Sequence, residues 1–359
     1  MHMNLIKKSI FLTLVLSLIS ISVRADVNVV TTIKPLHSLI SNVMKGVGEP
    51  SLIIEGTSNP HNFVLKPSHA KLLQDADIIF WIGENLEAFM EKPLSSLAKD
   101  AKKISFMELG SIKKLKFREN NIFDQDDHDG HKEDDHDDHD DHDGHKEDDH
   151  DDHDGHKEDD HDDHDGHKED DHDDHDDHDG HKEDDHDRHN HGEFDAHLWL
   201  DPVNAKEIVI EISHELSELD PANKNKYKAN ADKTIEVLDN LIKEVNQSLS
   251  KDISYVVFHD AYQYFEKRFE VTSAGALTLN PDVLPGAKQI VDIQSLIKEK
   301  NIKCIFSEPQ YNPKIIETLA SDTNISTGTM DPLGANLDRG VTMYSKLIMN
   351  IADSIKNCS

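Results

Sequence analysis

The sequence predicts an α/β protein of two lobes, each a mostly parallel sheet flanked by helices, joined by one long rigid helix. Short apolar runs alternate with amphipathic helical patterns, one helical pattern is unusually long, and a His/Asp-rich stretch without any aliphatic or aromatic residue interrupts the chain. We therefore expect a signal peptide at 1–25, an N-terminal lobe at 26–220 with a disordered insertion at 124–192, a linking helix at 221–251 and a C-terminal lobe at 252–359.

The first 25 residues are typical of a secretory signal peptide. Two lysines precede a predominantly apolar run at 10–21, and small residues lie before a possible cleavage site near Ala25. The apolar run is too short to span a bilayer, which takes roughly 20 helical residues. We expect an exported, soluble protein in a Gram-negative-type periplasm.

Strands and helices alternate along both lobes. Apolar runs predict strands at 28–32, 51–55, 77–82, 255–258, 303–307 and 325–328. Amphipathic patterns predict helices at 68–74, 86–97, 287–298 and 313–320. This alternation favours parallel sheets, in which ligands bind outside the carboxyl ends of the strands.

Residues 221–251 show a sustained helical period with no glycine and no internal proline. Pro221 fits a first helical turn, and Asp220 fits its cap. At about 1.5 Å per residue the helix would extend about 45 Å, which suits a rigid connection between two lobes. An ordinary long surface helix is the alternative.

The chain's charge is concentrated in the insertion at 124–192. It holds 31 Asp, 5 Glu and 19 His against 5 Lys and 1 Arg, and so carries −30 of the formal net charge of −34. Without apolar side chains it cannot offset the entropy lost on folding, so we expect a disordered surface loop. The acidity argues against nucleic-acid binding, which needs clustered Lys and Arg, and suits cations.

Three histidines outside the insertion lie where a predicted strand gives way to a loop. His61 follows the strand at 51–55, His197 opens the run His-Leu-Trp-Leu-Asp-Pro, and His259 ends the run Tyr-Val-Val-Phe. Each taken alone is more often structural than functional. Three further histidines lie within helical patterns and are interpreted as structural: His37, His69 and His214.

The residues around these histidines resemble the periplasmic metal-binding proteins of ABC importers. Three segments are similar to the family's metal-ligand blocks: 60–68 with 76–87, 197–202 and 258–265. Later blocks are matched at 280–281, 285–287, 307–310 and 330–334. The resemblance runs from about residue 28 to the C-terminus, and the insertion lies where ZnuA-type zinc-binding members carry a His-rich loop.

The resemblance implies a metal site of His61, His197 and His259. Manganese-type members place a Glu where this chain has His259, and zinc prefers imidazole whereas manganese favours carboxylate oxygen, so zinc is expected. Asp331, in the Asp-Pro-Leu-Gly motif, is the expected fourth ligand, with water as the alternative. Some members have an acidic residue before the first ligand histidine, but this chain has Pro60 there.

The function implied by the resemblance is that of a periplasmic zinc receptor. It would capture Zn²⁺, as transported ligand, between the lobes and deliver it to an inner-membrane ABC permease with a cytoplasmic ATPase, as a monomer. One alternative is a zinc-buffering or adhesin-like protein whose insertion is the active part. A zinc hydrolase is a weaker alternative, because only Glu308 is a tempting general base and no HExxH motif is present.

The histidines of the insertion are expected to form weak auxiliary metal sites. His and Asp supply nitrogen and oxygen donors on a mobile chain, which would raise the local zinc concentration near the tighter site. A dispensable insertion is the alternative. The residues concerned are His128, His131, His136, His139, His142, His145, His150, His153, His156, His161, His164, His167, His172, His175, His178, His181, His186, His189 and His191.

The two cysteines are expected to form a disulfide. Cys304 and Cys358 are the only cysteines, and an even pair in an exported protein most simply forms a disulfide, as it does at these places in the resembled family. Two unrelated thiols are the alternative.

Asp201 and Asp260 follow ligand blocks, and either orient imidazoles or cap helices.

Overall fold

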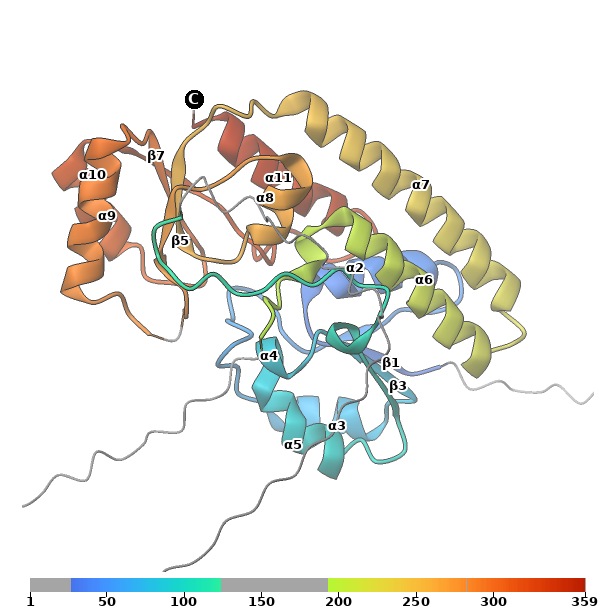
Figure 1. Ribbon diagram of the computed structural model, residues 1–359. Helices are drawn as coiled ribbons and strands as arrows, with labels where there is room; N and C mark the ends of the chain where they lie inside the picture. The colour runs from blue at the N-terminus through green and yellow to red at the C-terminus, as the bar shows by residue number, and fades with distance from the viewer. Residues whose placement is uncertain (1–26, 124–192, 282, 359) are drawn as a thin grey trace, which may run out of the picture. The chain divides into compact units, whose positions relative to one another are not determined.

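The computed structural model describes residues 27–123, 193–281 and 283–358 (Figure 1). The predicted signal peptide at 1–25 and the predicted insertion at 124–192, with its 19 histidines, lie outside these residues. The described parts on either side of the insertion belong to one compact unit.

The N-terminal sheet has four parallel strands in the order β2-β1-β3-β4. Its strands are β1 (Val29–Thr31), β2 (Ser51–Leu52), β3 (Ile78–Trp81) and β4 (Lys102–Ser105). Every residue of β3 is buried, as expected for a central parallel strand that is covered on both faces. The sequence did not predict β4, because its two exposed lysines hide the strand pattern at the sheet edge.

The C-terminal sheet repeats this arrangement with the order β6-β5-β7-β8, again all parallel. Its strands are β5 (Tyr255–His259), β6 (Gly275–Thr278), β7 (Cys304–Ser307) and β8 (Ser326–Thr329). The predicted fold class, two parallel sheets flanked by helices, is confirmed. The small residues of β6 gave no strand signal, and Gly275 is required there because a Cβ would lie 2.5 Å from the carbonyl oxygen of Asn121.

The helices cover both faces of the sheets. The helical elements are α2 (Lys34–Val43), α3 (Pro67–Gln74), α4 (Glu84–Glu87), η1 (Ala88–Met90), α5 (Glu91–Ser96), η2 (Phe106–Glu108), η3 (Leu198–Leu200), α6 (Pro202–Leu219), α7 (Lys224–Ser248), α8 (Gln263–Phe269), α9 (Ala287–Glu299), α10 (Lys314–Thr323) and α11 (Met343–Lys356). None of those in the described residues is long and apolar enough to cross a membrane.

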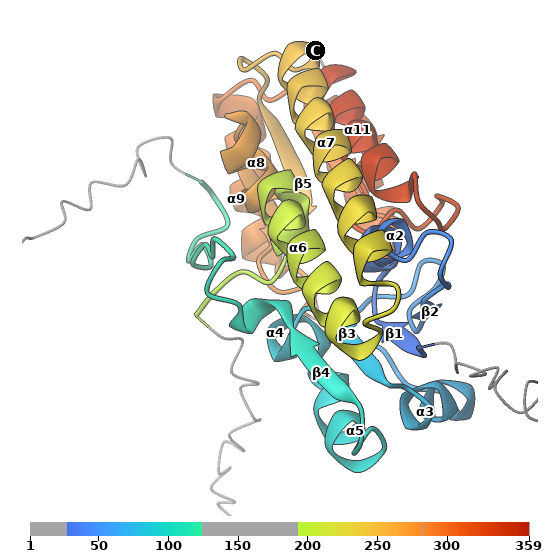
Figure 2. The same ribbon diagram turned by 90° about the vertical axis from the view of Figure 1, so that its right-hand side faces the viewer.

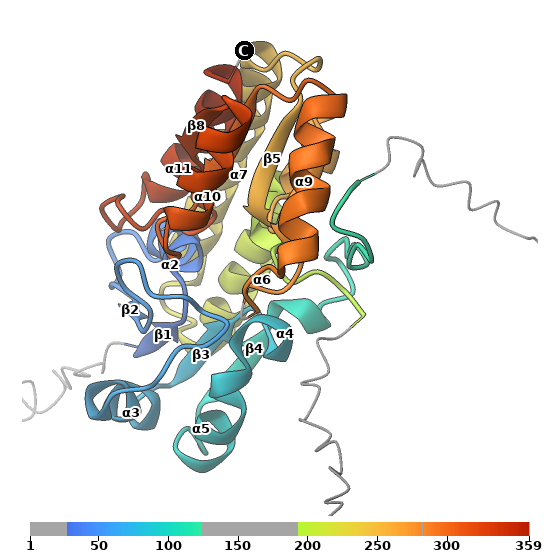
Figure 3. The same cartoon turned by 90° about the vertical axis from the view of Figure 1, so that its left-hand side faces the viewer.

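Strand β5 shows how alternation along a strand divides the core. Val256 and Phe258 belong to the cluster under α9 and α10, which lie on one side of the sheet (Figure 3). Tyr255 and Val257 belong to the larger cluster that also contains the buried side of α11. Because successive side chains of a strand point to opposite faces, one short strand contributes to both cores.

The predicted long helix is α7, which runs from Lys224 to Ser248 and is shorter at both ends than the predicted range 221–251. The predicted cap was wrong, because Asn223 is the N-cap of α7 whereas Asp220 is the C-cap of α6. Its buried positions include Tyr227, Leu238 and Val245. It packs along α6 and also contacts α2 and α11, so it joins elements from both ends of the chain (Figure 2). The lobe boundaries at 220 and 252 remain a prediction.

The segment 115–123, which we assigned to the N-terminal lobe, packs against the C-terminal sheet. The backbone N–H of Leu115 donates to the Tyr264 hydroxyl at 3.0 Å, and Ile122 forms an antiparallel bridge with Gly275. The chain before the predicted insertion therefore lies at the β6 edge. Sequence reasoning missed this crossing because its partners are about 150 residues away.

The two cysteines form the predicted disulfide. The Cα atoms of Cys304 and Cys358 are 5.6 Å apart, within the usual range for a disulfide. The bond joins the first residue of β7 to the end of the chain just after α11. It therefore fastens the last helix to the C-terminal sheet.

Candidate metal site

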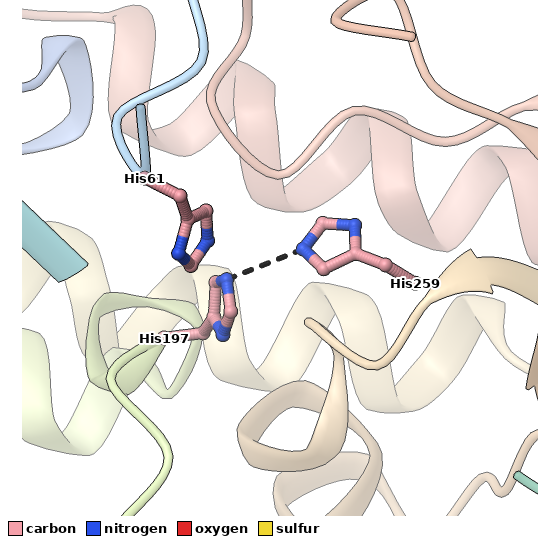
Figure 4. A group of neighbouring side chains, drawn as sticks. All are labelled: His61, His197 and His259. Atoms are coloured by element: carbon pink, nitrogen blue, oxygen red, sulfur yellow. Dashed lines mark hydrogen bonds between the residues drawn. The ribbon is translucent and has the colours of Figure 1, made fainter. Parts of the chain in front are cut away.

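The three predicted ligand histidines point toward one another (Figure 4). His61 comes from the loop after β2, His197 immediately precedes η3, and His259 is the last residue of β5. One ring nitrogen from each lies within 4.8 Å of the others. The Nε2 atoms of His197 and His259 are 3.4 Å apart, so one ion between these rings can bind both.

The three rings differ in burial. His197 and His259 are 4% and 3% exposed, whereas His61 is half-buried. All three line one pocket, whose walls also include Trp199 and Tyr311. A metal would therefore be bound between two rigidly buried imidazoles and one on the solvent side.

Two buried carboxylates orient the buried imidazoles. Asp195 Oδ1 lies 2.7 Å from His197 Nδ1 and also accepts the His197 backbone N–H at 2.9 Å. Glu308 Oε1 lies 2.7 Å from His259 Nδ1 and accepts the His259 backbone N–H at 3.3 Å. A carboxylate at Nδ1 favours the tautomer protonated there, so Nε2 is the nitrogen left to bind a metal.

The electrostatics of Glu308 also favour a cation in the pocket. Its side chain is 1% exposed, and burial raises the pKa of Glu308 well above its usual range. An ionised carboxylate in this place needs positive charge nearby, which a metal on His259 would supply. Sequence reasoning had considered Glu308 only as a hydrolytic base and had missed Asp195, although Asp195 precedes His197 by two residues.

Asp331 lies outside the group of three histidines. Its Oδ1 accepts from Gln310 Nε2 at 2.9 Å and from the Leu333 N–H at 3.0 Å, and its Oδ2 accepts from the Ala335 N–H at 2.5 Å. The carboxylate therefore holds the turn that follows it. The structure does not bring Asp331 together with the imidazoles, and its role as a ligand remains a prediction.

The two aspartates that follow ligand blocks form ion pairs rather than imidazole contacts. Asp201 accepts the Val203 N–H at 2.8 Å as the cap of α6 and binds Arg268 with both oxygens. Asp260 pairs with Arg118 at 2.7 Å. Burial raises the pKa of Asp260 to about 7, although the Arg118 charge opposes this shift.

A second group of possible ligands lies on α6. It consists of His214, Glu215 and Glu218, whose ligand atoms also come within 4.8 Å of one another. The Lys102 ammonium pairs with both glutamates. Because this cation already pairs with both carboxylates, we interpret the group as an ion-pair cluster, consistent with the structural role expected for His214.

The chain matches a known protein family over most of its length. The profile of the family described as ZnuA, zinc-uptake complex component A periplasmic, matches residues 29–358. A High-affinity zinc uptake system protein ZnuA of Brucella abortus (strain 2308) is 42% identical over 332 residues, which cover 92% of this chain and 91% of the relative.

Solved structures show the same fold. A crystal structure of ZnuA aligns with a TM-score of 0.65 at 18% identity and covers 93% of this chain and 99% of the other. A zinc-bound ZnuA deletion mutant aligns with a TM-score of 0.65 at 19% identity and covers 93% and 98% of the two chains. The chain therefore belongs to the ZnuA family of periplasmic zinc-uptake components.

Proposed function

We propose that this protein is a periplasmic zinc receptor that binds one Zn²⁺ tightly between His61, His197 and His259 and delivers it to an ABC permease. The observation that carries the proposal is the convergence of three imidazoles, two of them held at Nδ1 by buried carboxylates. The relatives named as high-affinity zinc uptake proteins support it.

The donor set suits zinc better than manganese. Zinc accepts three imidazoles at about 2.0–2.1 Å with a fourth ligand in a tetrahedron, whereas manganese favours carboxylate and water oxygens. Water or Asp331 would complete the coordination, and Asp331 would first have to leave the turn that it now holds. We take water as the better fourth ligand.

The position of Glu308 argues against a zinc hydrolase. A hydrolytic site needs a general base directed at a metal-bound water. Glu308 is the carboxylate nearest to this role, but its Oε1 contacts His259 Nδ1, on the opposite side of the ring from Nε2. Glu308 therefore orients a ligand, and the family match is to a transport receptor.

Zinc release is expected on acidification. Metal binding requires neutral imidazoles, so protons compete with zinc for the same ring nitrogens. Affinity should therefore fall as the pH is lowered.

We further propose that the insertion at 124–192 collects zinc at weak sites. The test is the metal stoichiometry of the full chain and of a variant lacking 124–192, both measured by titration against a competing chelator. The expected result is fewer zinc ions per chain in the deletion variant, with one tight site retained. Loss of the tight site in the deletion variant would contradict the proposal that the insertion supplies only weak sites and the three histidines the tight one.

Growth under zinc limitation distinguishes a receptor from a buffer. A strain without the protein is expected to starve in chelator-treated medium and to recover with the wild-type chain but not with His259→Ala. Recovery with His259→Ala but not with the variant lacking 124–192 would favour the buffering alternative.

N-terminal sequencing of the exported protein tests the proposed cleavage near Ala25, and its sedimentation tests the proposed monomer.

A further inference from the structure

Helix α2 carries a row of polar side chains directed at a distant segment of backbone. Lys34, Ser38 and Asn42 are spaced by four residues and therefore share one helix face. Their partners lie at 334–341, which contains no helix or strand. The carbonyl groups of this segment lack ladder partners, and the side chains of α2 bind several of them instead.

Lys34 makes the densest set of these contacts. Its ammonium donates to the carbonyl oxygens of Gly334, Ala335 and Leu337 at 3.0, 2.8 and 3.1 Å. An ammonium has three N–H groups, so all of them are used. The residue is only 9% exposed, and these carbonyls replace most of its hydration.

The other two residues of the row bind farther along the segment. Ser38 Oγ donates to the Gly340 carbonyl at 2.7 Å and accepts the Tyr344 N–H at 3.0 Å. Asn42 Nδ2 donates to the Val341 carbonyl at 2.7 Å. Asn42 therefore makes a similar contact to the same segment, seven residues beyond Gly334.

The residues that Lys34 holds adjoin the wall of the metal pocket. Pro332 and Leu333 line the pocket with the three histidines, and Trp199 Nε1 donates to the Pro332 carbonyl at 2.8 Å. Gly334, the next residue, has a φ of 63°, and a Cβ there would overlap the Met343 methyl group. The wall therefore has little freedom while the carbonyl groups that follow it, at Gly334, Ala335 and Leu337, are bound to Lys34.

We propose that Lys34 is a positioning residue that sets the rate of metal release by holding the Pro332–Leu333 wall over the three histidines. The inference rests on the proposed function, since it concerns the exit of the same cargo. The printed contacts of the Lys34 ammonium are to the carbonyls of Gly334, Ala335 and Leu337 and to none of the three histidines, so it acts through the wall. Breaking its contacts frees the wall and opens the pocket to solvent without removing an imidazole.

The experiment measures zinc dissociation from the full chain. Wild type, Lys34→Met and the matched control Asn42→Ala are loaded with less than one equivalent of zinc and mixed with excess chromogenic chelator. We expect release from Lys34→Met to be faster by about tenfold, the scale of one lost charged hydrogen-bonding anchor. Asn42→Ala should release zinc within about twofold of wild type.

Thermal unfolding of the metal-free variants separates this role from a loss of stability. The proposal is overturned if zinc release from Lys34→Met is no faster than from wild type. It is also overturned if release in Lys34→Met and Asn42→Ala accelerates in the same proportion to the drop in melting temperature. If Lys34→Met does not fold, Lys34→Arg decides, because a planar guanidinium does not reproduce three donors from one point. It should accelerate release by more than about twofold, and a wild-type rate overturns the proposal.

The control on the wild-type chain separates the two proposals. Absence of a tight zinc site in wild type contradicts the proposed function itself, and the role of Lys34 falls with it. Tight binding by wild type with unaltered release from Lys34→Met overturns only the role of Lys34.

Discussion

The two sheets share one strand order, but the buried glutamates that come after their third strands have different roles. In the N-terminal sheet the buried Glu87 accepts the backbone N–H groups of Ile82 and Gly83 at 2.9 and 3.2 Å, just after β3. In the C-terminal sheet the buried Glu308 follows β7, the corresponding third strand, and holds His259 at the end of β5. A buried carboxylate beside the central strands is thus structural in one sheet and orients a proposed ligand in the other.

This difference shows that equivalent sheets can use a buried glutamate either to stabilise a turn or to orient a proposed metal ligand. Carboxyl ends of parallel strands meet at one edge, so a side chain on the third strand can reach the end of the first. The C-terminal sheet uses this proximity to fix His259 and its carboxylate together. The N-terminal sheet fixes its own turn and contributes His61 from a half-buried loop.

The largest expected effect is on zinc affinity, when the proposed ligand at the end of β5 is removed. His259→Ala should weaken zinc binding by more than about 100-fold, because removing a ligand costs more than removing its hydrogen-bond partner. His61→Ala should weaken it less, since water can enter the solvent side of the pocket. Isothermal titration in the variant lacking 124–192 measures both, and equal affinity of wild type and His259→Ala would contradict the site.

The next effect concerns stability, because within the described residues only the C-terminal sheet is held by a disulfide. Replacing Cys304 and Cys358 together by alanine should lower the free energy of unfolding by roughly 3 to 4 kcal/mol, since the bond closes a 54-residue separation. Zinc affinity should change little. Denaturant unfolding without reductant measures the loss, and an unchanged midpoint would refute a stabilising role.

The paired carboxylates test the comparison directly. Glu308→Gln should weaken zinc binding about 10- to 100-fold, because it removes the charge that orients and polarises His259. Glu87→Gln is the matched control and should leave zinc affinity within about twofold, since Glu87 contacts backbone rather than a ligand. Chelator competition compares the two variants, and equal effects would show that the sheets do not differ as described.

The smallest effect is the pH dependence of stability due to Glu87. Burial raises the pKa of Glu87 to about 7, above the value of about 4.3 in an unfolded chain. The folded state therefore holds the proton more tightly, and the stability that Glu87 contributes is lost as the pH rises through 7. Between pH 6 and 8 wild type should lose roughly 1 kcal/mol more than Glu87→Gln.

The comparison with Glu87→Gln cancels the other buried acids. Asp260, whose pKa is also raised to about 7 by burial, is present in both proteins and contributes equally. Denaturant unfolding at pH 6, 7 and 8 measures the difference. Parallel curves for the two proteins would refute the assignment.

Much of the fold follows from local sequence patterns. His259 ends an apolar strand, and parallel strands carry ligands at their carboxyl ends, but the set of His61, His197 and His259 was implied by the family resemblance. The disulfide followed from there being only two cysteines in an expected exported chain. The position of α7 followed from its apolar period, although the helix is shorter at both ends than the predicted range.

The remaining features depend on neighbours that are distant in sequence. Glu308 reaches His259 only because β7 lies beside β5. Asp331 was expected as a fourth ligand from its Asp-Pro-Leu-Gly motif, yet the N–H groups of Leu333 and Ala335 bind both of its oxygens. The edge strand β4 carries two lysines where a sequence pattern expects apolar residues.

We propose that three imidazoles select one zinc ion. Anomalous diffraction at the zinc edge, from crystals of the protein with one equivalent of zinc, tests it most directly. The account predicts one dominant peak about 2.0–2.1 Å from a nitrogen of His61, His197 and His259. A dominant peak elsewhere, for example at His214 and Glu218, with none between these three rings would contradict it.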